Sequence, residues 1–268
     1  IDESLLEDIR QEVKHIYIYK EKKSSSWKWL NGDQMLVDWF RNTGVNFEWQ
    51  KVFILQSDIV MFKPLDYFIH GIEKDQFALS SFRNIKHVQD WWPHYEPDKI
   101  SEFELYLKEN IKFNGDLSCC LFVFALLPRE FFEYFKEKEY PGKYFLEYKI
   151  PSVLSALGFK PFQSEKFDAF WDEEPSRIYT PIQERNLLAV GHGISNEVIK
   201  KNLVENKNMI FHPCYSSLKN IDINNVKFTY VDMLSLAKMN ITESLKFTIK
   251  RLIKYNRKKR TGLLKLIK

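Results

Sequence analysis

The stretch that decides the predicted fold is Lys51–Phe68, KVFILQSDIVMFKPLDYF. Its apolar run, Val52–Leu55, predicts a strand that is buried on both faces. The polar triplet Gln56-Ser57-Asp58 interrupts the run, and a second apolar run follows over residues 59–62. A carboxylate between two apolar runs is costly to remove from water unless another group pairs with it.

Asp58 therefore has two interpretations. In an open α/β sheet, ligands bind just beyond the carboxyl ends of the strands, which is the predicted place of this residue. A divalent metal held there against a phosphorylated ligand would pair with the carboxylate. An aspartate that caps a turn or a helix would also explain it.

Composition and periodicity predict an α/β protein. The chain has 268 residues, of which 44% are hydrophobic and 28% charged, enough for one large domain or two small ones. Apolar runs such as Leu117–Leu127 and Met209–Tyr215 predict strands, and helical spacings lie between them. We therefore expect an α/β/α sandwich around a mostly parallel central sheet. The 22 Phe and 13 Tyr residues suit a binding cleft or an aromatic core.

The cysteines and the termini bear on location. Cys119, Cys120 and Cys214 show no metal-ligand spacing, which favours small core residues in a reducing compartment. No apolar run has the length of a membrane span and no signal peptide is visible, so we expect a cytoplasmic protein. The chain begins at Ile1 with a predicted helix (1–13) and strand (14–20), so we expect an earlier strand before it.

Several catalytic signatures are absent from the sequence. It contains no GxxxxGK[ST], GxGxxG, GxSxG or HExxH, which argues against kinases with a phosphate loop, dehydrogenases, serine hydrolases and zinc proteases. The remaining candidates are Asp58, Glu147 and His212. A carboxylate-held Mg²⁺ or Mn²⁺ neutralises a diphosphate leaving group, histidine suits Mn²⁺, and a further carboxylate can deprotonate an acceptor hydroxyl.

The order of these motifs resembles that of GT-A-type glycosyltransferases. A strand ends in QSD (56–58), a carboxylate follows at a helix start (Glu147-Tyr-Lys-Ile-Pro), and a His-Pro pair comes late (His212-Pro213). The resemblance covers most of residues 14–215 and implies a Rossmann-like fold. It also implies transfer of a sugar from a nucleotide-diphosphate-sugar to a hydroxyl acceptor, in surface glycan or polysaccharide synthesis.

Residue roles follow from the resemblance by position. Asp58 matches the second Asp of the DxD motif and, with His212, would hold Mn²⁺ or Mg²⁺. Gln56, Ser57 and Asp58 would bind the donor, and Glu147 would be the catalytic base. From the residues alone, Glu147 also suits a first helical turn and His212 a buried, hydrogen-bonded position. Asp33 either contacts the donor nucleotide or caps the helix after it.

The sequence departs from the family pattern at Gln56, which stands where the first Asp of DxD is expected. An amide oxygen is neutral, so the affinity for a metal should fall unless other groups compensate. Asp58, His212 and donor phosphates would then carry the site, or no metal would be used. The alternative function is a non-catalytic module that binds glycans or a membrane surface on the same fold.

The C-terminal segment is distinct in charge. Ten basic and no acidic residues lie in Lys246–Lys268, which leaves 30 basic and 36 acidic residues elsewhere, a net charge of −6. Apolar residues recur there at helical spacing. We therefore expect a domain over residues 1–240 and a basic amphipathic tail over 241–268, which either lies on anionic lipid or is a solvated terminus. The acidic body offers no surface for nucleic acid.

Overall fold

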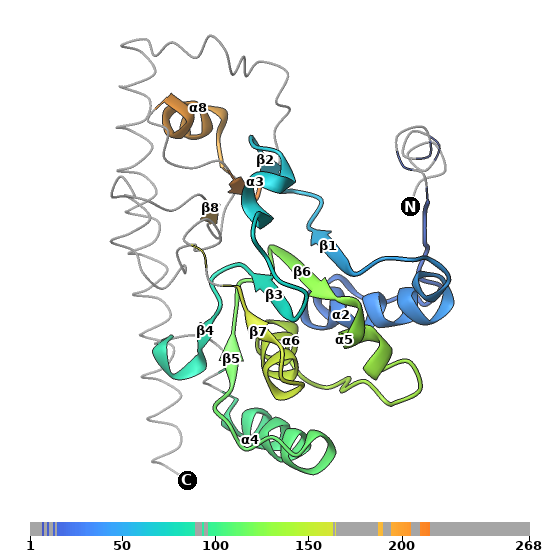
Figure 1. Cartoon of the computed structure of the whole chain (residues 1–268). Coiled ribbons are helices and arrows are strands. Elements are labelled where there is room, and N and C mark those ends of the chain that lie inside the picture. The colour runs from blue at the N-terminus through green and yellow to red at the C-terminus, as the bar shows by residue number, and fades with distance from the viewer. Residues whose placement is uncertain are drawn as a thin grey trace. The chain divides into compact units, whose positions relative to one another are not determined.

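The structure is a computed structural model and describes residues 15–88, 96–162, 187–189, 194–204 and 210–214, with the isolated residues Glu7, Arg10, Val13, Pro93 and Ser164. The chain divides into two compact units (Figure 1). Unit 1 comprises Ile1–Ile54 and Ile72–Phe162, and unit 2 comprises Leu55–Gly71 and Gln163–Lys268. The predicted tail (241–268) lies outside the described residues.

The central sheet of unit 1 has four strands, in the order β1-β6-β3-β7. They are β1 (Lys51–Leu55), β3 (Gln76–Leu79), β6 (Phe124–Pro128) and β7 (Lys160–Pro161). Strand β3 runs antiparallel to β6 and parallel to β7. The α/β class is thus confirmed, but the described sheet is mixed rather than mostly parallel. Strand β1 stands at its end, so it is half-buried and not buried on both faces as predicted.

The predicted strand Leu117–Leu127 is two strands. Its first part, β5 (Ser118–Cys119), pairs antiparallel with β4 (Arg83–Asn84), and its last part is β6. Between them, the Leu121 amide donates to the Ser80 carbonyl at 2.9 Å. Here the chain leaves the two-stranded sheet and enters the central sheet, although no glycine or proline marks this change in the sequence.

The helices of unit 1 are α2 (Ser25–Asn42), α4 (Pro97–Tyr106), α5 (Arg129–Tyr134) and α6 (Leu146–Ala156), with short turns η1 (Gly44–Asn46), η2 (Ile85–His87) and the π-helical η4 (Leu107–Ile111). Helix α2 begins eight residues before Asp33, because the Ser24 side chain caps it by accepting from the Trp27 amide. The chain kinks at Asn31 within it. The prediction that Asp33 caps this helix is therefore wrong.

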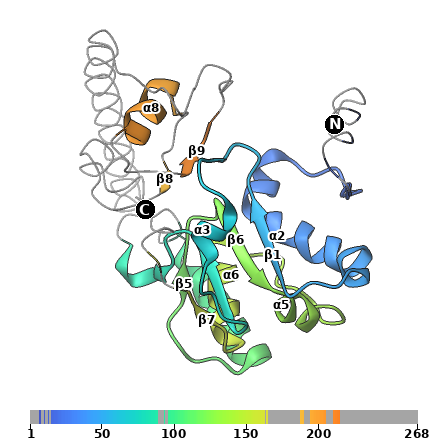
Figure 2. The ribbon, with the colours of Figure 1, turned by 45° about the horizontal axis from the view of Figure 1, so that its top comes forward.

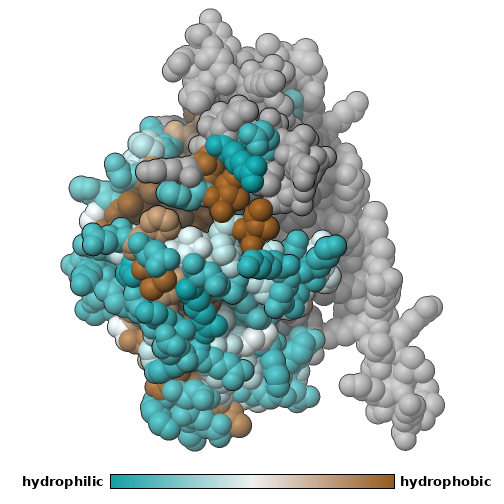
Figure 3. Space-filling model, turned by 90° about the vertical axis from the view of Figure 1, so that its right-hand side faces the viewer, coloured by the Kyte–Doolittle hydropathy of each residue, from teal (hydrophilic) through white to brown (hydrophobic). Residues whose placement is uncertain are grey.

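Unit 1 has an aromatic core. Helix α6 packs on α2 and β5, and α5 packs on β6. The rings of Phe40, Phe131, Phe132 and Phe135 are at most 1% exposed. The aromatic-core interpretation is thus confirmed for these residues. On the face shown in Figure 3, hydrophobic side chains form small groups within a mostly hydrophilic surface.

Unit 2 contains a three-stranded sheet in the order β2-β9-β8. Figure 2 labels two of its strands, β8 and β9, and the helix α8 of the same unit. Its described elements are β2 (Val60–Met61), α3 (Leu65–Ile69), β8 (Leu187–Ala189), α8 (Asn196–Val204) and β9 (Ile210–His212). Strand β9 runs antiparallel to β2 and parallel to β8. Ile194, Ile199 and Phe211 form its buried cluster, against which Phe62 and Cys214 pack. The strand predicted within Met209–Tyr215 is confirmed over Ile210–His212.

Candidate functional site

The QSD triplet lies in a turn between β1 and β2. The Ile59 amide donates to the Gln56 carbonyl at 3.3 Å, which closes the turn. The Cys214 amide donates to the Asp58 carbonyl at 2.7 Å, next to the pairing of Val60 with Phe211. The antiparallel pairing of β2 with β9 therefore brings the turn beside the end of β9.

His212, at the end of β9, contacts both polar side chains of the turn. Its Nε2 lies 2.7 Å from Gln56 Oε1 and 3.4 Å from Asp58 Oδ1. The side chains of His212 and Asp58 are 19% and 26% exposed, and Ser57 is exposed. Four residues predicted from the sequence thus lie together within unit 2.

The donor atoms of this group suit a small, hard cation. Adjacent ligands of a divalent ion with bonds of about 2.1 Å lie roughly 3 Å apart. The distances from His212 Nε2 to Asp58 Oδ1 (3.4 Å) and to Gln56 Oε1 (2.7 Å) are close to that separation. Mg²⁺ is commonly held by one or two carboxylates with substrate phosphates completing its shell. The residues present therefore fit part of a coordination shell.

The protein's own share of such a shell is small. Among the described residues, no group of three or more His, Cys, Asp or Glu side chains is arranged to hold a metal ion. Cys214, whose amide donates to the Asp58 carbonyl, is a further candidate, but burial, and secondarily the charge of Asp58, raise the pKa of its thiol to about 11. A metal bound here would need oxygen ligands from a bound diphosphate or from water.

Glu147 belongs to unit 1, in the first turn of α6, as predicted. Its Oε1 accepts from the Phe122 amide at 3.0 Å, and its carbonyl accepts from the Cys120 amide at 2.8 Å. Both contacts are with the connection between β5 and β6. Glu147 thus has a structural task in holding this connection, and its role as catalytic base stays a prediction.

Asp33 lies in the interior of unit 1 and is 1% exposed. Its Oδ2 is 2.9 Å from Lys149 Nζ and accepts from the Tyr140 hydroxyl at 2.6 Å. Lys149, which is 0% exposed, also donates to the Pro141 carbonyl at 2.9 Å. Asp33 Oδ1 is buried and has no hydrogen-bond partner in the described structure. Contact between Asp33 and a donor nucleotide stays a prediction.

Sequence reasoning missed Lys149 as the partner of Asp33. Burial lowers the pKa of Lys149, while the charge of Asp33 and its hydrogen bond oppose that change. The available signal was the apolar setting of this lysine, which stands between Tyr148 and Ile150 in a helix whose other residues are mostly buried. A lysine that is buried in such a segment needs a carboxylate partner, because an unpaired buried charge is costly.

Within the described part of the chain, no helix is long and apolar enough to cross a membrane. Comparisons with protein families, with curated proteins and with solved structures found no match to this chain.

Proposed function

We propose that this protein is a GT-A-like glycosyltransferase, which moves a sugar from a nucleotide-diphosphate-sugar to a hydroxyl acceptor. The observation that carries the proposal is the grouping of Gln56, Asp58 and His212. These residues are up to 156 positions apart in the chain and meet where β2 pairs with β9. The family order of motifs calls for this grouping, whereas a turn-capping aspartate would not need a histidine beside it.

Asp58 and His212 would bind Mn²⁺ or Mg²⁺ together with the diphosphate of the donor. Gln56 would add a neutral amide oxygen, and the exposed Ser57 hydroxyl would donate to a phosphate oxygen. When bound, the metal supplies positive charge that stabilises the departing diphosphate. His212 Nε2 must give up its proton to become a ligand, so its contact with Gln56 would change on metal binding.

Glu147 is the proposed base. Its carboxylate would take the proton of the acceptor hydroxyl while that oxygen bonds to the anomeric carbon of the donor sugar. The bond from this carbon to the phosphate oxygen breaks, and the nucleoside diphosphate leaves with the electron pair. Direct attack of this kind inverts the configuration at the anomeric carbon.

The acceptor class and the location are part of the same proposal. A basic amphipathic segment gains about 1 kcal/mol for each basic residue close to an anionic membrane surface. The segment Lys246–Lys268 would therefore hold the enzyme at the inner face of the membrane, near a lipid-linked or surface-glycan acceptor. Binding to vesicles with and without phosphatidylserine tests this part, and equal binding to both would contradict it.

The decisive experiment measures binding and hydrolysis of a panel of nucleotide-sugars by the intact protein, with Mn²⁺, with Mg²⁺ and with a chelator. We expect at least one donor to bind in a metal-dependent way and Asp58→Asn to abolish that binding. The matched control is Asp66→Asn, which removes an exposed carboxylate from α3 in the same unit. Absence of binding to every donor would refute the proposal.

A second candidate is a glycan-binding module without turnover on the same fold. The amide of Gln56, in place of a carboxylate, and its 2.7 Å contact with His212 Nε2 favour it, because that nitrogen would otherwise ligate a metal. This candidate predicts glycan binding that a chelator leaves unchanged and no affinity for any donor.

A further inference from the structure

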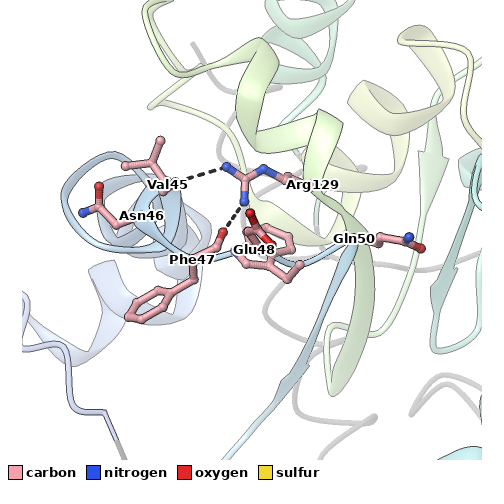
Figure 4. A pocket seen from close by; sticks show the side chains of 7 residues that line it. Val45, Asn46, Phe47, Glu48, Gln50 and Arg129 are labelled. Carbon is pink, nitrogen blue, oxygen red and sulfur yellow. Dashed lines mark hydrogen bonds between the residues drawn. The ribbon is translucent and has the colours of Figure 1, made fainter.

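An open pocket lies within unit 1, on the segment that leads into β1. It is formed by residues 45–50, between α2 and β1, and by Arg129, the first residue of α5 (Figure 4). Its volume is about 670 Å³, within the range of pockets that hold small organic ligands.

Arg129 holds the wall of this pocket in place. Its guanidinium donates to the carbonyls of Phe47 and Val45, at 2.5 and 3.2 Å (Figure 4), and its amide donates to the Gln50 carbonyl at 2.8 Å. The indole of Trp49 donates to the Gly44 carbonyl at 2.9 Å. Because the wall is fixed before a ligand arrives, binding would cost little ordering of the chain.

The charges of the pocket disfavour an anionic ligand. Arg129 is its one cation, and the Arg129 Nε donates to Glu133 Oε1 at 2.9 Å. Glu48, on the pocket wall, brings a further carboxylate. A phosphate or nucleotide would meet two acidic groups and one cation that is already paired.

The remaining lining suits a neutral polyol. Asn46, Glu48 and Gln50 are exposed and offer both donors and acceptors, which matches hydroxyl groups that donate and accept. Phe47 is 39% exposed, and His15 lies against its ring with the centroids 5.0 Å apart. Trp49 is half-buried, with the Arg129 guanidinium 5.2 Å from its ring. The exposed part of the Phe47 ring can pack against the C–H groups of a sugar, whereas the Trp49 ring is already packed against core rings and supports the wall.

We propose that this pocket binds an uncharged oligosaccharide. All residues of this pocket belong to unit 1 and none to the QSD turn. Its ligand binding can therefore be tested separately from the proposed transfer reaction. In a glycosyltransferase it would hold a part of the glycan away from the reacting hydroxyl. In a non-catalytic module it would be a glycan site in its own right.

The test is saturation-transfer NMR with the intact protein and three probes, maltotriose, lactose and N,N′-diacetylchitobiose, without nucleotide-sugar. We expect at least one probe to bind, and the double variant Asn46→Ala/Glu48→Ala to weaken its binding at least tenfold. Neither of these two side chains hydrogen-bonds to another described residue, so the variant should fold. The matched control is Glu102→Ala/Glu104→Ala on α4, two exposed carboxylates of the same unit, which should bind as the wild type does.

Four results would overturn the assignment. They are no binding of any probe to the wild type, undiminished binding to the pocket variant, equal loss in the control variant, and displacement of the sugar by millimolar inorganic phosphate. Asp58→Asn should leave probe binding unchanged. If Asp58→Asn loses donor binding but still binds the sugar probe, the result supports both sites independently. If the wild type binds a donor but no probe, the pocket assignment fails alone; if it binds a probe but no donor, the proposed transfer reaction fails alone.

Discussion

Each unit joins a carboxylate to a nitrogen base from a distant part of the chain, but the two pairs differ in burial. The side chains of Asp33 and Lys149 in unit 1 are 2% and 0% exposed, and Tyr140 and the Pro141 carbonyl complete their contacts. Asp58 and His212 of unit 2 are 26% and 19% exposed and lie 3.4 Å apart.

The difference in burial predicts different roles for the two pairs. A buried pair is enclosed by its own partners, and removal of one member leaves an uncompensated charge. A partly exposed pair contributes little to stability, since water can replace either partner. We therefore expect changes at Asp33 and Lys149 to act on folding, and changes at Asp58 and His212 to act on ligands.

The largest effect on stability is expected from Lys149→Met, because it leaves the Asp33 carboxylate buried without its cation. The free energy of unfolding should fall by about 3–5 kcal/mol. Urea denaturation followed by tryptophan fluorescence measures it. The double variant Asp33→Asn/Lys149→Met removes both charges and should recover most of the loss, whereas a loss below about 1 kcal/mol in the single variant would contradict the account.

The next largest loss of stability is expected when the hydroxyl of Tyr140 is removed. Tyr140→Phe removes a hydrogen bond to the buried Asp33 carboxylate, and such bonds to charged groups contribute about 1.5–3 kcal/mol. Tyr144→Phe is the matched control, since the Tyr144 hydroxyl makes no hydrogen bond to a described residue. Equal destabilisation of the two variants in the same urea experiment would show that the contact with Asp33 adds nothing.

Alkaline pH should weaken unit 1 through its buried tyrosines. Burial, as the main cause, raises the pKa of Tyr106 and of Tyr148 from 10.0 to about 12. The unfolded chain then loses these protons first, so the free energy of unfolding should fall as pH rises from about 10 to about 12. We expect Tyr148 to account for a loss of about 1–2 kcal/mol in the free energy of unfolding, which is less than its whole pKa shift would give.

Tyr148→Phe isolates this contribution. Lys149 changes stability in the opposite direction. Because its pKa is lowered in the folded protein, the unfolded chain keeps the ammonium proton of this lysine to higher pH, so its contribution to the free energy of unfolding rises with pH. The comparison of interest is therefore the slope of unfolding free energy against pH in the variant and in the wild type. A variant slope as steep as that of the wild type would exclude Tyr148 as a source.

The smallest effect on stability is expected at the exposed pair. Asp58→Asn should change the free energy of unfolding by no more than about 1 kcal/mol, because both partners remain partly hydrated. Phe211→Ala, which empties a fully buried position beside His212, should cost about 3–5 kcal/mol in the same assay. If Asp58→Asn destabilised as much as Phe211→Ala, the pair would be structural and the contrast between the units would fail.

The sequence predicted the exposed pair better than the buried one. Strand patterns around Asp58 and His212 were strong, and the family order of motifs linked the two residues. The pairing of β2 with β9 then supplies the contact. The partner of Asp33 was not predictable from local patterns, because a lysine in the first turns of a helix usually faces water, and only tertiary packing placed Lys149 against α2.

The same limit explains the error in the sheet. The run Leu117–Leu127 is apolar except for Ser118, so it carries no signal of the turn at Phe122–Val123 that separates β5 from β6. Nor does an apolar run specify strand direction, and the antiparallel pairing of β3 with β6 was therefore missed. The α/β class, by contrast, follows from the alternation of element types, which the sequence does contain.

Unit 2 is built from two separate segments of the chain, so the order of synthesis determines when its parts can meet. Gln56 and His212 are 156 residues apart, and at roughly 5–20 residues per second a ribosome needs about 8–30 s between them. The second segment of unit 1, Ile72–Phe162, is synthesised entirely within that interval. The contact between Gln56 and His212 therefore cannot form until translation has passed His212, long after the QSD turn has been synthesised.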